Sequence, residues 1–483
     1  GVPPAAQARA AELLGASRRI AYHAWTGVGQ HTNATQTERA IATLYALLGS
    51  FDVRGGNRLF GRPAGRVVNG LDLLAPAQRA KALGLGARPL GPPAQGWVTA
   101  LDLYRAVLEG EPYRVRALMS FGTNLVVSQA DSLRAREALA ALEFGVHCDL
   151  FETPSARFAD LLLPVNTPWE REGLRIGFEI DERAAGHVQL RPRMVAPQGE
   201  SRSDNEIVFD LAVRLGHGEA FFGGRVEAGW NHMLEPLGLT VEALRAQPAG
   251  VARPVDAAER KYARRVAGAM AGVDVNAGDD RGQGVATETR RVELHADLLR
   301  RHGQPPLPTH VEPAESPRDA ARTDGGRFPY VLASAKNGLY CHSQQRGLAS
   351  LRRRAPRPLA EIGEALAARE GLRDGDAIRI RTRVGAARFV ARVVPGLADG
   401  LVFAEYGWWE ACPELGLPGA DPLAELGSSF NRLVSAADAA DPVSGSVAMR
   451  SFLCRVERDP SVVRAWAGWR PFVVAALDRS TEG

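Results

Sequence analysis

The pattern of secondary-structure signals changes once along this 483-residue chain, at a stretch rich in Pro, Gly and charged residues. Up to residue 215, short apolar segments alternate with helical periodicity, residues 220–325 are mixed, and from residue 328 the segments have β character. Alternating strands and helices favour an open, parallel, doubly wound α/β sheet, whereas successive short strands favour a barrel. We therefore expect α/β domains first, an interdomain linker at residues 309–327, and then a separate β-barrel-like domain.

The expected elements follow from the spacing of apolar residues and from the turns between them. The expected strands of the first region are residues 19–25, 115–120, 144–149 and 160–164, and its main expected helices are 7–15, 37–48, 101–108, 132–142 and 205–215. The expected barrel strands are residues 330–334, 377–382, 387–394, 401–406 and 452–456.

Composition argues against several classes of protein. With 59 Lys and Arg against 55 Asp and Glu, the formal charge is only +4, which does not indicate a nucleic-acid partner. No uninterrupted apolar stretch approaches the roughly 20 residues of a membrane helix, so we expect no direct membrane span. The four cysteines lie far apart without a C-x-x-C pair, which argues against a zinc ribbon or an iron–sulfur cluster within this chain. They leave cytoplasm and periplasm equally open.

The first candidate binding segment is the loop TGVGQHTNATQ, which lies between an expected strand and a helix. Gly27 and Gly29 would let the backbone approach a ligand closely, and Gln30, His31 and Thr32 supply polar side chains. A phosphate could bind backbone N–H groups at the start of the following helix. The alternative is a tight turn with a helix cap.

The second candidate combines SFGTN and CDLFETPS, each at the carboxyl end of an expected strand, where open α/β sheets bind ligands. Asp149 could accept the N1–H and N2–H₂ donors of a guanine, and Thr153 could contact the rest of a nucleotide. The alternative is that Thr153 caps a helix and that Asp149 only ends a strand.

Two further polar segments stand out. The loop NGLYCHSQQRG offers His342, Ser343, Gln344 and Arg346 after a barrel strand, and a ligand-contacting loop and an ordinary surface loop are equally compatible with it. The segment WEREG has two carboxylates two residues apart, and a structural role is the better interpretation.

Taken in order, these segments resemble the dimethyl sulfoxide (DMSO) reductase family of molybdopterin oxidoreductases, which includes formate dehydrogenases, nitrate reductases and thiosulfate or polysulfide reductases. The resemblance spans residues 7–458. Its motifs are TGVGQHTNATQTERAIATLYALLGSFDVRGGN, ADLLLPVNTPWEREG, GVATETRRVELHADLL, LYCHSQQRGLASLRRRAPRPLAEI, GLRDGDAIRIRTRVG, YGWWE, and FNRL with DPVSG.

The resemblance implies two molybdopterin guanine dinucleotides holding Mo or W, two nucleotide-binding α/β domains and a C-terminal double-psi β-barrel. The implied regions are the end of a first α/β domain at 1–70, a second at 71–225, a connecting region at 226–325, the barrel at 326–460 and a tail at 461–483. Gly27, Gly29, Gln30, His31 and Thr32 match the family's pterin or phosphate loop; Gly122, Thr123, Asn124, Asp149, Phe151, Thr153 and Asp160 match its guanosine pocket; and His342, Ser343, Gln344, Arg346 and Asn431 match the barrel's contacts to the pterins.

The family's Cys-rich segment and its metal-ligating residue have no match in this sequence. We therefore expect the C-terminal portion of a longer enzyme, with a 4Fe–4S cluster in a preceding segment and no catalytic residue that can be named here. The family implies a small substrate, such as formate or an oxo or sulfur compound, and a separate iron–sulfur protein as electron-transfer partner. The alternative is a non-catalytic structural subunit of a respiratory complex, with the same fold and no pterin.

Overall fold

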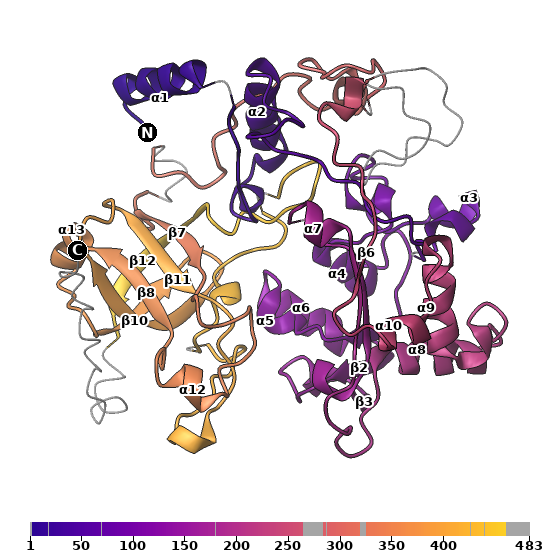
Figure 1. The fold of residues 1–483 in the computed structure, drawn as a ribbon. Coiled ribbons are helices and arrows are strands. Elements are labelled where there is room, and N and C mark those ends of the chain that lie inside the picture. Colours follow the sequence, from indigo (N-terminus) through magenta and orange to yellow (C-terminus); the bar gives the residue numbers. More distant parts are fainter. Residues whose placement is uncertain are drawn as a thin grey trace, which may run out of the picture.

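The computed structural model describes residues 2–17, 19–68, 70–178, 180–263, 284–285, 287–318, 325–425, 427–438 and 440–459. An α/β part lies beside a barrel of orange and yellow strands (Figure 1). The expected tail at 461–483 lies outside the described residues.

A three-stranded parallel sheet forms the centre of the α/β part, in the order β1-β2-β3. It consists of β1 (Ala117–Phe121), β2 (Phe144–Asp149) and β3 (Leu161–Pro164). The helices α4 (Ala100–Leu108), α5 (Leu125–Ser128) and α6 (Ser132–Ala140) contribute Tyr104, Val126 and Leu139 to one buried cluster. The predicted parallel α/β sheet is confirmed, and its polar strand ends face one edge.

The predicted strand at residues 19–25 is wrong, because this segment pairs with no strand in the part of the chain that the structure describes. Instead, the Asn57 side chain bonds both backbone groups of Tyr22: Tyr22 N donates to Oδ1 at 2.6 Å, and Nδ2 donates to Tyr22 O at 2.7 Å. A side-chain amide thus supplies the bonds that a neighbouring strand would supply. The helices around this segment are α1 (Pro4–Ala16), α2 (Ala34–Leu47) and α3 (Pro76–Arg79).

A second, antiparallel sheet, in the order β4-β5-β6, was not expected from the sequence. It consists of β4 (Gly173–Ile176), β5 (His187–Arg191) and β6 (Val251–Ala252). Its core contains Val188 and Leu190 from β5 together with Leu234 and Leu244 from nearby helices. The helices of this region are α7 (Glu182–Ala185), α8 (Asp204–Arg214), α9 (Val226–Leu234), α10 (Val241–Arg245) and, further along, α11 (Asp297–Arg301).

The C-terminal region is a closed barrel with the strand order β10-β8-β11-β7-β12-β9, which confirms the predicted barrel domain. Five of its six strands were expected, and β8 was not. The strands are β7 (Tyr330–Ala335), β8 (Leu359–Gly363), β9 (Ala377–Arg381), β10 (Ala386–Val394), β11 (Leu401–Glu405) and β12 (Phe452–Arg458), with short helices α12 (Ala349–Arg352) and α13 (Glu364–Arg369).

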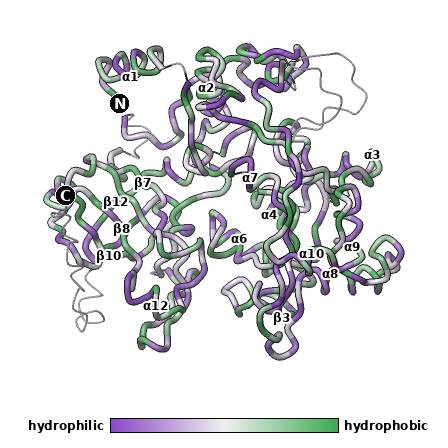
Figure 2. Tube along the Cα trace, viewed as in Figure 1, coloured by the Kyte–Doolittle hydropathy of each residue, from purple (hydrophilic) through white to green (hydrophobic). Residues whose placement is uncertain are grey.

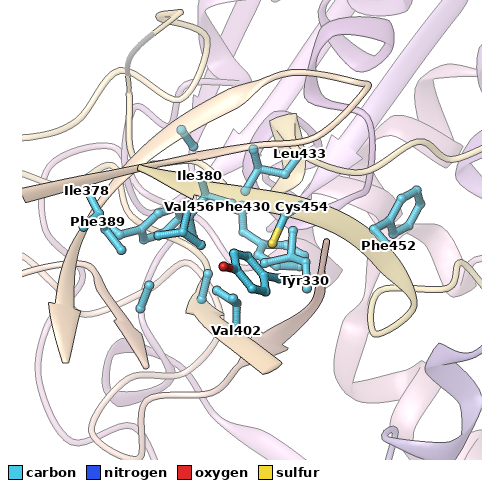
Figure 3. Close-up of a cluster of buried hydrophobic side chains, with 14 of the residues drawn as sticks. Tyr330, Ile378, Ile380, Phe389, Val402, Phe430, Leu433, Phe452, Cys454 and Val456 are labelled. Carbon is cyan, nitrogen blue, oxygen red and sulfur yellow. The ribbon is translucent and has the colours of Figure 1, made fainter. Parts of the chain in front are cut away.

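Side chains alternate along the barrel strands, so that one face of each strand fills the interior. In β9, Ile378 and Ile380 are fully buried, whereas Arg381 bonds Glu457 at the surface at 2.7 Å. Hydrophobic and hydrophilic residues are accordingly mixed along the chain trace (Figure 2). The interior is packed with aliphatic and aromatic groups, including Phe389 and Phe430 (Figure 3). The barrel is therefore a solid support, and its loops are the parts available for binding.

None of the helices in the described part of the chain is long and apolar enough to cross a membrane.

Candidate functional site

The first group of candidate residues lies at the carboxyl ends of β1 and β2. Gly122 follows β1 with a φ of +55°, and its N–H donates to Cys148 O at 2.9 Å. Asn124 comes next but one and is only 7% exposed. Asp149 ends β2, and one of its carboxylate oxygens accepts the N–H of Leu150 at 2.6 Å. Because ligands of open α/β sheets bind at this edge, it is the candidate nucleotide site.

The loop after β2 combines exposed and buried members of this group. Phe151 is 62% exposed, and Thr123, on the loop after β1, is half-buried. Thr153 is 4% exposed, and its hydroxyl accepts the N–H of Ala156 at 3.3 Å, so it also caps a helical turn. Ser155 donates to Asn124 Oδ1 at 3.0 Å and thereby ties the two loops together.

A buried histidine that the sequence analysis did not single out connects the same residues. The ring nitrogens of His147 lie 2.9 Å from Ser120 Oγ and 3.1 Å from Thr153 Oγ1. Its Nε2 also lies 3.4 Å from Asp149 Oδ2. The sequence could have indicated His147 through its position two residues before Asp149, because residues two apart in a strand lie on the same face.

Asp160 lies away from this group, at the amino end of β3. Its Oδ2 accepts the N–H of Gly145 at 2.7 Å, near the start of β2. Gly145 and Asp149 lie four positions apart along the strand, which corresponds to about 13 Å. The structure therefore does not bring Asp160 together with the other guanosine-pocket candidates, and its carboxylate links the strand starts.

The glycine loop contacts the barrel through a residue that the sequence analysis missed. Arg450 Nε donates to Gln30 Oε1 at 3.0 Å, and Arg450 N donates to Gln30 O at 3.2 Å. A Cβ at Gly27 would lie 3.9 Å from Arg450 Cζ, whereas a Cβ at Gly29 would meet open space. Arg450 forms no ion pair with the residues that the structure describes. Its charge is therefore open to an anionic ligand.

The adjoining His31 ties the same loop to the next barrel residue, while Thr32 is half-buried. His31 Nδ1 lies 3.0 Å from Ser451 Oγ. Burial, and then the charge of Arg450, lower the pKa of His31 below its usual value. The imidazole is thus kept neutral at the interface between the α/β part and the barrel.

A barrel carboxylate occupies the start of helix α2. Asp441 is 2% exposed and accepts bonds from Thr35 N at 2.9 Å and Thr35 Oγ1 at 2.7 Å. It also accepts the N–H groups of Val443 and Ser444 at 3.0 and 2.7 Å. A negative charge at a helix N-terminus is stabilising, so this contact fixes α2 on the barrel. The Thr35 amide is consequently not free for the phosphate that the loop pattern suggested.

The barrel loop after β7 is organised around a buried guanidinium. Arg346 is 2% exposed and donates to His342 O at 2.7 Å and to Tyr406 O at 2.6 Å. Its Cζ lies 4.5 Å from the ring centre of Tyr340 and 5.0 Å from that of Trp408. Burial lowers the pKa of Arg346 to about 10. Arg346 therefore shapes this loop from within.

The residues around Arg346 differ in their exposure to solvent. Ser343 is 8% exposed, and its carbonyl accepts Trp409 Nε1 at 2.6 Å. His342 and Gln344 are exposed, and His342 adopts a φ of +49°. Their exposure makes His342 and Gln344, unlike Ser343 and Arg346, available to a ligand.

Two buried amides near α5 lack partners for one of their atoms. Asn124 Nδ2 and Asn431 Oδ1 have none among the described residues. Asn431 is 1% exposed, and its Nδ2 donates to Val127 O, one turn from Asn124. An unsatisfied buried polar atom costs about 1–3 kcal/mol, so such atoms indicate where a bound group supplies a partner.

A cavity of about 600 Å³ lies between the glycine loop, α5 and the last barrel loop. Its lining includes Gly29, Gln30, Leu125, Ser128, Gln129 and Met449. It thus joins the segment after Asn124 to the segment next to Arg450. Among the described residues, no group of three His, Cys, Asp or Glu side chains could hold a metal ion.

The WEREG segment is structural, as expected. Glu170 is 5% exposed and accepts bonds from Thr167 N and Oγ1 at 2.6 and 2.7 Å and from Gln198 N at 2.7 Å. These donors hold the pKa of Glu170 below its usual range. Its carboxylate is therefore committed to a capping box and is not a proton carrier.

Comparison with known proteins identifies the family. Residues 6–214 match the model of the molybdopterin oxidoreductases, and residues 330–453 match that of the molydopterin dinucleotide binding domain. The chain belongs to the molybdopterin oxidoreductases and is related to the enzymes of the DMSO reductase family. Its barrel is the dinucleotide-binding domain.

Several relatives support this assignment. A dopamine dehydroxylase from Eggerthella lenta is 28% identical over 88% of this chain and 47% of that protein. An acetylene hydratase from Syntrophotalea acetylenica is 26% identical over 66% of this chain and 41% of that protein. The solved structure of acetylene hydratase from Pelobacter acetylenicus, 21% identical, covers 93% of this chain and 62% of that chain with a TM-score of 0.77. The chain spans about half the length of the curated relatives it matches.

Proposed function

We propose that this chain forms the cofactor-holding part of a molybdopterin-dependent oxidoreductase catalytic subunit. In this proposal it binds two molybdopterin guanine dinucleotides with Mo or W, and the whole enzyme converts a small substrate such as formate or an oxo or sulfur compound. The observation that carries the proposal is the meeting of the glycine loop with Arg450 beside the cavity of about 600 Å³.

The residues present fit such a cofactor. Arg450 has a guanidinium without an ion-pair partner among the described residues, and guanidinium groups bind phosphate strongly. Asn124 Nδ2 and Asn431 Oδ1, which have no hydrogen-bond partner within the described ranges, suit a ligand rich in hydrogen-bonding groups. Asp149 Oδ2 is an acceptor at the sheet edge, suited to the paired N–H donors of guanine.

The assignment of roles follows from this fit. Gly27, Gly29, Gln30 and Arg450 would hold a pterin or phosphate, and the group around Asp149 would hold a guanosine. His342 and Gln344 would contact a pterin from the barrel side. When bound, the metal and its dithiolene sulfurs supply the redox chemistry, and the chain supplies binding, orientation and electrostatics.

The substrate and the path of the electrons rest on relatives. Their printed names include a dehydroxylase, a hydratase and a DMSO reductase, so the substrate differs among them. Two are named as parts of larger enzymes: the alpha subunit of an F420-dependent formate dehydrogenase and the putative catalytic subunit of a dimethyl sulfoxide reductase. These names support a partner subunit, and the proposal takes this partner to be an electron-transfer protein with an iron–sulfur cluster.

The rival function is a structural subunit without pterin. A scaffold does not need an Arg450 without an ion-pair partner among the described residues beside a cavity, or exposed polar side chains such as His342 and Gln344 on a barrel loop, and this favours the enzyme. Elemental analysis and pterin fluorescence of the protein, purified with any natural partner from its own organism, separate the two. Molybdenum or tungsten together with pterin supports the enzyme, and the absence of all three supports the scaffold.

A further inference from the structure

We propose that His147 is a positioning residue that sets the preference of the Asp149 pocket for guanine over other purines. The inference rests on the proposed nucleotide site. His147 lies on β2, 4% exposed, between Ser120 on β1 and the loop that carries Thr153. It therefore links the strand ends on which the pocket is built.

The proposal takes the neutral tautomer of His147 that carries its proton on Nδ1. In this tautomer Ser120 Oγ accepts from His147 Nδ1–H at 2.9 Å and donates its own proton to Val146 O at 3.3 Å. His147 Nε2 is then an acceptor and receives the Thr153 hydroxyl proton at 3.1 Å. This leaves a nitrogen lone pair, and no N–H donor, 3.4 Å from Asp149 Oδ2.

This arrangement defines what each group offers a ligand. The Thr153 proton is committed to His147, so Thr153 cannot donate it to a base. Asp149 Oδ2 receives no proton from the neutral ring and remains an acceptor at the pocket. A base with adjacent N1–H and N2–H₂ donors satisfies a carboxylate better than a base with one donor or none. Guanine has both donors, hypoxanthine one, and adenine lacks the N1–H.

His147 acts through its neighbours and does not touch the base. The cavity beside its ring, also lined by Ser120, Thr123 and Ser155, has a volume of about 20 Å³. That is room for a single water molecule. A purine cannot enter it, so any effect of His147 on base preference passes through Asp149 and Thr153.

The test measures binding of GMP, IMP and AMP to the full chain, produced without its cofactor, by titration calorimetry. Loss of one charge-assisted hydrogen bond is expected to weaken binding about tenfold, so the wild type should bind GMP about tenfold more tightly than IMP. His147→Gln keeps an acceptor near the position of Nε2, and His147→Asn keeps one only near Nδ1. We expect His147→Gln to retain most of the GMP preference and His147→Asn to reduce the ratio to about twofold or less.

The outcomes distinguish the inference from its basis. A wild-type protein that binds GMP no better than IMP overturns the guanosine pocket itself, and the inference falls with it. A wild-type preference that persists in His147→Asn overturns the role of His147 alone. Melting temperatures of the two variants complete the test. If His147 had only a structural role, each variant would lose its preference for GMP in proportion to its loss of stability.

Discussion

At the scale of single residues, Arg346 carries its positive charge inside the loops that cover the barrel. The guanidinium donates to carbonyl groups and stacks on two aromatic rings, which compensates for its loss of water. A lysine cannot reproduce a planar group with donors on several sides. The shape of the loop that presents His342 and Gln344 therefore depends on arginine at this position.

Arg346→Ala is expected to lower the free energy of unfolding by about 3 kcal/mol, because buried carbonyl groups lose their donors and a cavity forms. Arg346→Lys should recover little of this. Chemical denaturation measures both. The control is Arg353→Ala at an exposed position of the same segment, which should change stability by less than about 0.5 kcal/mol. Equal effects of the two alanine variants would contradict the account.

His31 makes the interface between the glycine loop and the barrel sensitive to pH. Its pKa is lower in the folded state than its usual 6.5, so the unfolded chain binds more protons as the pH falls through that value. Stability contributed by neutral His31 is therefore present above about pH 6.5 and is lost below it. The melting temperature should decline between pH 7 and pH 5.

His31→Asn should flatten this decline, because it removes the titrating group but keeps a polar side chain near Ser451. His302→Asn, at an exposed position, serves as the matched control and should leave the wild-type pH profile unchanged. Identical profiles for wild type and His31→Asn would show that the His31 contact does not control stability in this range.

At the scale of elements, the contact of Asp441 with the start of α2 connects the two parts of the molecule. One carboxylate serves both a helix N-terminus and its own loop. Asp441→Ala should cost about 1–2 kcal/mol, as loss of a helix cap does, and should speed amide hydrogen exchange in the first turn of α2.

Asp438→Ala is the control for this prediction, because Asp438 bonds Arg383 at the surface. It should leave exchange in α2 unchanged. If α2 exchanges at the wild-type rate in Asp441→Ala, then Asp441 does not fix this helix on the barrel.

The sequence predicted the elements whose signal is local. The predicted bounds of β2 agree with the structure. Its segment starts just after a predicted helix and stops at the charged residue Asp149, and both ends are visible in the local sequence. β8 was missed because it follows a charged run that contains proline. The β4-β5-β6 sheet was missed because β4 and β6 are only four and two residues long, although β5 (HVQLR) alternates clearly. The strand expected at 19–25 failed because a side chain, Asn57, replaced the pairing strand.

The sequence predicted which segments form the candidate site, but not which residues of these segments contact one another. Glycine loops and strand ends are local patterns, and they indicated Gly29 and Asp149 as candidates. Arg450 and His31 contact partners 420 residues away, which no local spacing reveals. His147 was missed because its role depends on Ser120, which a neighbouring strand brings within reach.

At the scale of the whole molecule, the α/β part and the barrel enclose the site together. The cavity draws on both, and Arg450 connects them beside it. Arg450→Gln keeps a hydrogen-bonding group near Gln30 and removes the charge. It should reduce the cofactor content of the purified protein roughly tenfold, because one charge-assisted phosphate contact is lost.

The control for this prediction is Arg458→Gln, which removes a surface ion pair with Asp376 at the far end of β12. It should leave the cofactor content unchanged. Equal pterin content in Arg450→Gln and wild type would mean that Arg450 does not contact the cofactor.

The central claim is that this chain holds molybdopterin guanine dinucleotide between its α/β part and its barrel. The direct measurement is the amount of GMP that acid hydrolysis releases from the protein, purified from its own organism, together with its protein concentration. The account predicts two GMP per chain, one for each cofactor. Protein that is folded by circular dichroism and releases no GMP would contradict it.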